Sequence, residues 1–419
     1  MKAYPLLCCA CLLVVILLVA MQGCKYEVAE PMWDKPAPET TTPAITGIVP
    51  SQGTAGVNFI TIQGQQFSDS IADMSVYFNT TLAEIISLSH SSITVRRPNM
   101  FDPSATVKVI SSKAYLAVKT GPYRVDKVFD KYGSFLDNIT LGPVCFNGDT
   151  MYVLETATPY YWFRVTPNGI KTRDTLTGSV RRIPYDVRIH NGILYWMGNN
   201  REILQVNLTT RVTSRWIQLP QGGVVSKFGD FGSNNYFYTG ATSTDLCIVP
   251  PTTAGTILSS VAKEGEYIAE EILAVRVFNN YVYVASRTNS AAPAIIYKHL
   301  IGTGATLGSR QLVLDMSTTA FSSRSVKALS FSSSGTMFVI TDAPNPILVF
   351  DGTKLDYFYK EIISHSVNNS TSYWLAKQAY WGTTNNLYLI GNDSLTATAA
   401  ADRWNVLKID MGTLGAPYY

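Results

Sequence analysis

One short pattern of apolar and polar residues recurs through the C-terminal two-thirds of this 419-residue chain. Residues 190–198, "HNGILYWMG", begin with Asn-Gly, the pair favoured in a two-residue hairpin turn with positive φ angles. The apolar run that follows, with an aromatic residue at its centre, predicts a buried strand. Similar stretches centre on Tyr152, Tyr195, Phe237, Tyr283, Phe338 and Tyr388, at intervals of 43, 42, 46, 55 and 50 residues.

Each of these stretches is accompanied by an apolar run before it and another after it, as in "YDVRI" and "ILQVNL" around residues 190–198. Six copies of a multi-stranded unit at this period predict a six-bladed β-propeller, in which each blade buries its faces against its neighbours. Few residues remain after Trp404 for the outermost strand of the last blade. We therefore predict that residues 123–130, "YRVDKVFD", supply that strand and close the ring.

The loops that enter each first strand and those that join the second strand to the third share one face of a propeller. These loops carry aromatic rings, which stack on the flat C–H faces of sugars, together with polar groups that can bond sugar hydroxyls. The candidate ligand-binding residues are Tyr160, Tyr161, Arg182, Tyr185, Tyr267, Arg287, Asp342, Tyr373 and Trp374. The alternative is that at least half of the rings fill gaps between blades.

Residues 44–125 contain short alternating strands at regular spacing, which predict a small β-sandwich. The segment resembles an IPT/TIG domain, an immunoglobulin-like module. The matching residues are Ile45, Ile48, Pro50, Gly53, Gly56, Ile60, Ile62, Gly64, Phe67, Val76, Phe78, Ala83, Ile93, Val95, Pro98 and Val107. The resemblance implies a spacer or presentation domain. The expected fold is therefore all-β, with an immunoglobulin-like sandwich followed by a six-bladed propeller over residues 126–419.

The chain begins with Lys2 and a strongly apolar run from Leu6 to Ala20, the pattern of a signal peptide. The run is short for a membrane span of about 20 residues. "MQGC" at 21–24 resembles a bacterial lipobox, which implies a leader over residues 1–23 and a lipid on Cys24; the alternative is an ordinary secretory signal. Residues 24–43, rich in Pro, Thr and acidic residues, are expected to form a flexible tether.

The formal net charge is +3, and this near-balance gives no electrostatic case for a nucleic-acid partner. The four histidines do not fall in a metal-ligand spacing, and the chain has no phosphate-cradling loop or CxxC motif. We therefore expect no metal and no cofactor. Cys145 and Cys247 lie in apolar runs and are expected to be buried free thiols.

The order of leader, IPT/TIG domain and six-bladed propeller, which is NHL-like only in general terms, resembles surface lipoproteins of polysaccharide-utilisation systems in Bacteroides-type bacteria. That resemblance implies a lipid-anchored outer-membrane protein, facing the cell exterior, that binds an extracellular polysaccharide or oligosaccharide for a neighbouring importer. One alternative is a propeller glycoside hydrolase or polysaccharide lyase, although the sequence fixes no pair of carboxylates at the required separation. Another is a surface scaffold that binds a protein partner.

Overall fold

The computed structural model describes residues 42–419 except 115, 134, 136–140, 156–160, 178–182, 199, 223–224, 242–244, 362–373 and 394–404. The predicted leader and almost all of the predicted tether lie outside the described residues. Regular structure in the described ranges consists of β-strands and two short 3₁₀ turns, η1 (Ile71–Asp73) and η2 (Met316–Thr318). No helix among these residues has the length and apolarity needed to cross a membrane. The all-β prediction is confirmed.

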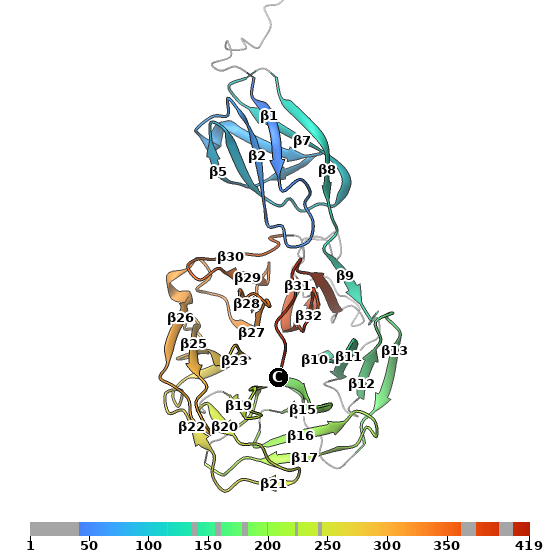
Figure 1. Ribbon diagram of the computed structural model, residues 1–419, viewed down its shortest axis with the longest axis vertical. Helices are drawn as coiled ribbons and strands as arrows, with labels where there is room; N and C mark the ends of the chain where they lie inside the picture. Colours follow the sequence, from blue (N-terminus) through green and yellow to red (C-terminus); the bar gives the residue numbers. More distant parts are fainter. Residues whose placement is uncertain are drawn as a thin grey trace, which may run out of the picture.

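The first unit is a sandwich of two four-stranded sheets (Figure 1). One sheet has the order β1 (Ala44–Val49), β2 (Phe59–Gln65), β6 (Ser92–Arg96), β5 (Ile85–Ser89), and the other β4 (Thr81–Ala83), β3 (Met74–Phe78), β7 (Asp102–Ser111), β8 (Val118–Val125). Alternate residues of these strands, among them Ile60, Ile62 and Val76, point inward and form one apolar core. The period-2 pattern in the sequence therefore follows from the pleat of the strands.

Six further sheets, the blades, are arranged in a ring (Figure 1). Each blade packs against the blade that follows it along the chain. Blade 1 comprises β10 (Leu141–Asn147), β11 (Thr150–Glu155), β12 (Tyr161–Val165) and β13 (Lys171–Thr175). Blade 2 comprises β14 (Asp186–His190), β15 (Ile193–Met197), β16 (Glu202–Asn207), β17 (Thr213–Gln218) and the added β21 (Thr256–Ile257). Blade 3 comprises β18 (Phe228–Phe231), β19 (Phe237–Gly240), β20 (Cys247–Val249) and β22 (Ala262–Lys263).

Blade 4 comprises β23 (Glu271–Phe278), β24 (Tyr281–Arg287), β25 (Ile295–Leu300) and β26 (Gln311–Asp315). Blade 5 comprises β27 (Val326–Phe331), β28 (Met337–Thr341), β29 (Ile347–Phe350) and β30 (Leu355–Tyr357). Blade 6 comprises β31 (Trp374–Tyr380), β32 (Asn386–Asp393), β33 (Asn405–Asp410) and β9 (Phe129–Tyr132). The predicted six-bladed propeller is therefore confirmed.

The six aromatic residues that revealed the repeat all lie in the second strand of their blade, from Tyr152 in β11 to Tyr388 in β32. Asn191 and Gly192 have φ angles of 50° and 74°, as the predicted hairpin turn between β14 and β15 requires. Local turn chemistry and an apolar second strand therefore specify each copy, and the copies then pack against one another. Apolar clusters accordingly span adjacent blades, as where Val339 of β28 and Ala285 of β24 share one cluster.

The ring is closed by a strand that precedes all the others in the propeller. β9 pairs antiparallel with β33, with Phe129 opposite Ile409 and Tyr132 opposite Val406. The prediction that the segment entering from the sandwich completes the last blade is confirmed. The strand lies at 129–132, because Tyr123–Val125 remain paired with β7 in the sandwich.

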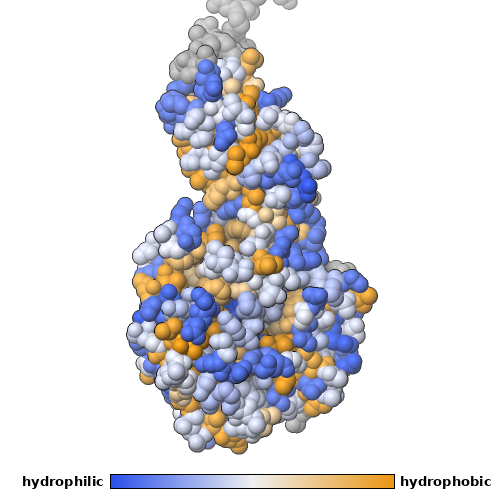
Figure 2. All heavy atoms as spheres, in the orientation of Figure 1, coloured by the Kyte–Doolittle hydropathy of each residue, from blue (hydrophilic) through white to orange (hydrophobic). Residues whose placement is uncertain are grey.

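The sandwich is fixed to the rim of the ring beside blades 5 and 6, and a narrower waist separates the two lobes (Figures 1 and 2). Tyr359, fully buried at this junction, accepts a hydrogen bond from the Gly56 amide at 2.6 Å and donates one to the Asp410 carbonyl at 2.8 Å. Arg96 of the sandwich pairs with Asp356 of β30 at 3.2 Å. Because the junction lies at the rim, the sandwich leaves the two faces of the ring uncovered.

Candidate functional site

The first strands of the blades line a central channel that contains four buried charged residues. Arg188 Nη1 lies 2.6 Å from Asp186 Oδ1, and Arg276 Nη1 lies 2.9 Å from Asp230 Oδ2. Arg188 Nε is also 3.3 Å from Asp230 Oδ1, so the charges alternate around the wall from β14 through β18 to β23. Gln378 of β31 donates to Asp186 at 2.6 Å, which extends the network to blade 6. Opposite charges in contact offset the cost of removing each from water.

The C-terminal segment of the chain enters this channel, and the end of the chain lies inside the ring in Figure 1. The Ala416 amide donates to the Phe331 carbonyl at 2.9 Å, and the Pro417 carbonyl accepts from Arg276 at 2.9 Å. The ring of Tyr418 then lies against Arg276 and stacks on Tyr380 with centroids 4.6 Å apart. Tyr418 therefore stands between the two faces of the propeller.

The face predicted to bind the ligand carries a cavity of about 400 Å³, which we call the basic cavity. Its lining residues lie in or just before the first strands of all six blades, with Arg287 added from the end of β24. The first-strand residues are Leu141, Gly142, Pro143, Ile183, Pro184, Tyr185, Lys227, Phe228, Glu271, Leu273, Ser325, Val326, Lys327, Lys377 and Gln378. Cavities of this size hold small organic ligands.

Two of the predicted ligand-binding residues, Tyr185 and Arg287, line the basic cavity. Tyr185 is 43% exposed, and Lys227 lies over its ring with Nζ 5.3 Å from the centroid. Arg287 is bonded to Glu271 at 2.7 Å. A third, Asp342, lies beside the cavity, where it pairs with Lys327 at 3.2 Å.

The other predicted residues are placed differently. Tyr267 is fully buried, and its hydroxyl lies 2.7 Å from His299 Nε2, so its ring has no surface open to a ligand. Tyr161 lies on β12 with the guanidinium of Arg173 3.8 Å from its ring centroid, and it does not belong to the basic cavity. Tyr160, Arg182 and Tyr373 are outside the described residues, and Trp374 is described only as a backbone position in β31, opposite Asp393.

The basic cavity brings positive charges close together. Burial lowers the pKa of Lys227 below its usual range, Glu271 opposes that shift, and the charges of Lys327 and Arg287 add to it. Nearby like charges destabilise one another's charged form, so this group of residues is electrostatically suited to a negative ligand.

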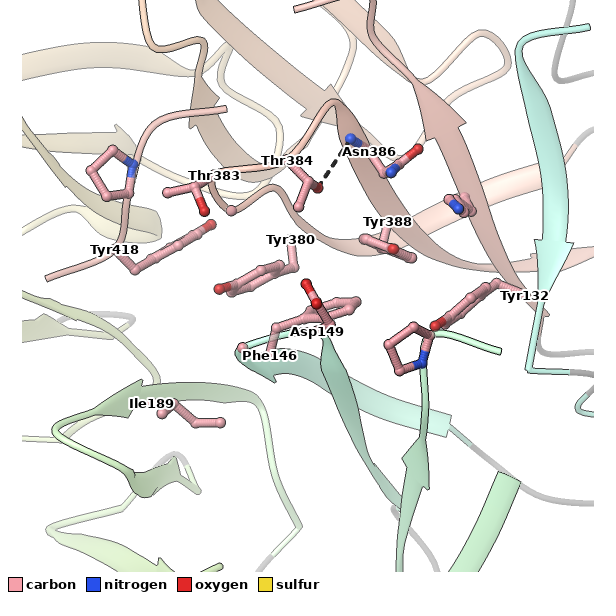
Figure 3. A pocket seen from close by; sticks show the side chains of 15 residues that line it. Tyr132, Phe146, Asp149, Ile189, Tyr380, Thr383, Thr384, Asn386, Tyr388 and Tyr418 are labelled. Carbon is pink, nitrogen blue, oxygen red and sulfur yellow. Dashed lines mark hydrogen bonds between the residues drawn. The ribbon is translucent and has the colours of Figure 1, made fainter. Parts of the chain in front are cut away.

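The opposite face carries a second cavity, of about 390 Å³, which we call the aromatic cavity (Figure 3). It lies between blades 6 and 1, where their first strands turn into their second strands. Five aromatic residues line it, namely Tyr132, Phe146, Tyr380, Tyr388 and Tyr418. The rest of its described lining is Gly148, Asp149, Pro167, Ile189, Gly382, Thr383, Thr384, Asn386, Lys408 and Pro417.

The five rings form one continuous row across this cavity. Tyr418 stacks on Tyr380, Tyr380 stacks on Phe146 with centroids 5.0 Å apart, and Phe146 lies 4.3 Å from Tyr388. Tyr132 meets Tyr388 edge to face at 5.2 Å. The row of rings therefore joins strands of blades 6 and 1 and the C-terminal segment. Burial raises the pKa of Tyr132, Tyr380 and Tyr388, so their hydroxyls stay protonated at neutral pH.

Polar groups stand beside the rings. Asp149, Thr383 and Thr384 are exposed, and Asn386 and Lys408 are half-buried. They supply a carboxylate, hydroxyls, an amide and an ammonium group, all of which bond sugar hydroxyls. Among the residues that the structure describes, no group of three or more His, Cys, Asp or Glu side chains could hold a metal ion. Cys145 and Cys247 are buried and unpaired, as predicted.

Neither the aromatic cavity nor the lysines of the basic cavity were predicted from the sequence. Tyr380 and Tyr388 lie within strand runs, where an aromatic residue is normally a packing residue. A weak signal is present for two of the lysines, because Lys227 and Lys327 lie where the first strand of their blade begins, whereas Lys377 lies in the middle of β31. The residues next to Tyr418 in the sequence give no sign that it lines a cavity, since its position depends on where the C-terminal segment docks.

Residues 43–124 match the model of the IPT/TIG domain, and this part of the chain is an IPT/TIG domain. No curated protein matches the chain. Among solved structures, an auxiliary nutrient binding protein from Bacteroides ovatus is 10% identical over 87% of this chain and 97% of its own, with a TM-score of 0.46. A protein of the same description from Bacteroides thetaiotaomicron is 10% identical over 88% and 98%, with a TM-score of 0.47.

A luciferin-regenerating enzyme is also similar, at 9% identity over 70% of this chain and 98% of its own, with a TM-score of 0.49. These proteins carry different descriptions, and what this chain binds has to follow from its own residues.

Proposed function

We propose that this protein binds an extracellular oligosaccharide or polysaccharide, and that the aromatic cavity holds part of the glycan. The single observation that carries this proposal is the row of five aromatic rings with hydroxyl, amide, carboxylate and ammonium groups beside it. Sugars combine apolar C–H faces with many hydroxyls, and protein sites for them combine aromatic surface with a few convergent polar groups.

Binding is favoured over hydrolysis by the carboxylates of the two cavities. Most glycoside hydrolases use two carboxyl groups that face each other across the scissile bond. The described lining of the aromatic cavity contains one carboxylate, Asp149, and that of the basic cavity contains one, Glu271, which is bonded to Arg287. The described residues of neither cavity therefore supply two carboxyl groups that face each other, as such hydrolysis requires.

The proposal also assigns a place in the cell. A lipid on Cys24 anchors the protein in the outer membrane, residues 24–43 act as the tether, and the IPT/TIG domain holds the propeller outward, where a neighbouring importer takes up the glycan. The rim attachment of the sandwich supports this arrangement, because none of the described residues that line the two cavities belongs to that domain.

Affinity gel electrophoresis against a panel of neutral polysaccharides, with product analysis, tests the glycan proposal. Retardation without released oligosaccharide is expected. Phe146→Leu, which removes a ring but keeps apolar volume, and Asp149→Ala should each weaken binding to the retarding polysaccharide about five- to tenfold. Asp130→Ala, an exposed change on β9 outside the cavity, is the matched control and should bind normally.

Released oligosaccharide would favour the hydrolase or lyase alternative. Absence of retardation across the panel would favour the protein scaffold. For the anchor, the full chain and its Cys24→Ser variant should partition to the membrane and soluble fractions of the producing bacterium, respectively. Equal membrane association of the two would contradict lipidation at Cys24.

A further inference from the structure

We propose that the basic cavity is a second binding site, which takes a carboxylate or sulfate group on an organic ligand such as an acidic sugar. This site lies on the opposite face of the ring from the aromatic cavity and shares no described lining residue with it. The inference therefore stands independently of what the aromatic cavity binds.

The first strands of four blades have an interrupted register at the same place, beside this cavity. The pairing of the first strand with the second is interrupted between Leu141 and Val144 in blade 1 and between Ile272 and Ala274 in blade 4. It is interrupted at the corresponding place between Val326 and Ala328 in blade 5 and between Ala376 and Gln378 in blade 6.

The residues within these interruptions, Gly142, Pro143, Leu273, Lys327 and Lys377, all line the basic cavity. A β-bulge bends its strand and re-aims a side chain, and bulges are frequent next to binding sites. Four blades that bulge at one place therefore form a site to which separate strands contribute, and two of the re-aimed side chains are lysines.

Positive side chains outnumber negative ones in the described lining of the basic cavity. Four basic side chains line it, those of Lys227, Arg287, Lys327 and Lys377, whereas its described lining has one carboxylate, Glu271. Arg287 holds Glu271, and Asp342 at the edge holds Lys327. Lys227 is half-buried above the rings of Tyr185 and Phe228, with Nζ 5.3 and 5.1 Å from their centroids. A bound anion would offset the mutual repulsion of these cations.

The remainder of the lining selects for a ligand with an apolar surface as well as a charge. Ile183, Pro184, Leu273 and Val326 contribute hydrocarbon, and the half-exposed ring of Tyr185 stands at one side. A bare inorganic anion would leave this surface in contact with water. An acidic sugar has a charged group for the lysines and C–H faces for the tyrosine.

Isothermal titration of the full chain with three probes tests the proposal: a galacturonate trisaccharide, its neutral methyl ester, and a sulfated disaccharide. The acidic trisaccharide, the sulfated disaccharide or both should bind, whereas the ester should bind at least about tenfold more weakly. Affinity should fall with added salt. The two acidic probes distinguish a carboxylate from a sulfate ligand.

Lys227→Met and Lys327→Gln should each reduce the affinity for the acidic probe about tenfold. Lys354→Gln, an exposed lysine next to β30, is the control and should have no effect. Circular dichroism of each variant checks that the ring is intact, and if one variant is misfolded the other decides the result. Failure of both acidic probes to bind, equal binding of the ester, or unchanged affinity in a folded lysine variant would overturn the proposal.

Binding of the neutral polysaccharide to the aromatic cavity should persist in both lysine variants. Loss of acidic-probe binding with retained neutral-glycan binding would thus separate the two sites. Weaker neutral-glycan binding in Phe146→Leu, with acidic-probe binding unchanged, would separate them in the other direction.

Discussion

The centroid of the Tyr418 ring lies 3.6 Å from the guanidinium carbon of Arg276, a side chain that is only 1% exposed. Arg276 also binds Asp230 and the carbonyls of Ala416 and Pro417. One buried arginine thus joins blade 3, blade 4 and the C-terminal segment. The position of Tyr418 in the aromatic cavity depends on this contact.

We expect Tyr418→Ala to lower the free energy of unfolding by about 2 kcal/mol, because a desolvated cation–π contact and the stacking on Tyr380 are both lost. Urea denaturation followed by fluorescence measures the change. Tyr418→Phe keeps both ring contacts and should be close to the unmodified chain. A loss in the phenylalanine variant as large as in the alanine variant would show that the hydroxyl, and not the ring, is important.

Arg276→Met should be more damaging, with a loss of about 3–5 kcal/mol, because Arg188 would then be shared between two buried carboxylates, those of Asp186 and Asp230. The double variant Arg276→Met with Asp230→Asn should recover part of that loss, since the charge is then also removed. Thermal and urea denaturation of the two variants make the comparison. No recovery in the double variant would mean that the cost arises from packing and not from the second carboxylate.

At the junction between sandwich and ring, Gly412 has a φ of +68°, and a Cβ there would lie 2.3 Å from the Ala55 carbonyl oxygen. Gly412→Ala should therefore displace the two lobes and cost about 1–3 kcal/mol. Gly352→Ala is the matched control, because Gly352 also has a positive φ, +101°, but has open space around it. Small-angle scattering and denaturation should show a larger change for Gly412→Ala than for Gly352→Ala.

Anion binding to the basic cavity should weaken as the pH rises from neutrality toward 10.5, the ordinary pKa of lysine. The pKa of Lys227 lies below that value, so its ammonium group loses its proton within this range and its attraction for the ligand is lost. Glu271, Arg287, Lys327 and Lys377 face the same space and set the remaining charge. Titration calorimetry at increasing pH, with Lys227→Arg as the comparison, checks this; the arginine variant should retain affinity to higher pH.

Much of the fold could be predicted because each blade has a recognisable pattern within a short stretch of sequence. The turn at Asn191 and Gly192 and the aromatic centre of the next strand are properties of neighbouring residues, and their repetition defines the ring. The closing strand could also be predicted, since a four-stranded last blade lacked one strand after β33. Its position, a few residues later than expected, was determined by how far β8 extends in the sandwich.

The sites were harder to predict, because their residues come together only when the ring closes. Tyr185 and Arg287 were found through the topology of the loops, which places them on one face. Tyr267 has the same loop position but points into blade 4, and the sequence holds nothing that distinguishes these two orientations. The aromatic cavity depends on Tyr132 from the closing strand and Tyr418 from the C-terminal segment, whose locations follow from tertiary packing alone.

The pairing of β9 with β33 also bears on how the protein is made. β9 leaves the ribosome before every other strand of the ring, and its partner leaves last, so the circle stays open throughout synthesis of the propeller. During that time the unpaired edges of β9 and the apolar flanks of blades 1 and 6 remain available for incorrect pairing. The completed circle removes these edges in one late event, the pairing of β9 with β33.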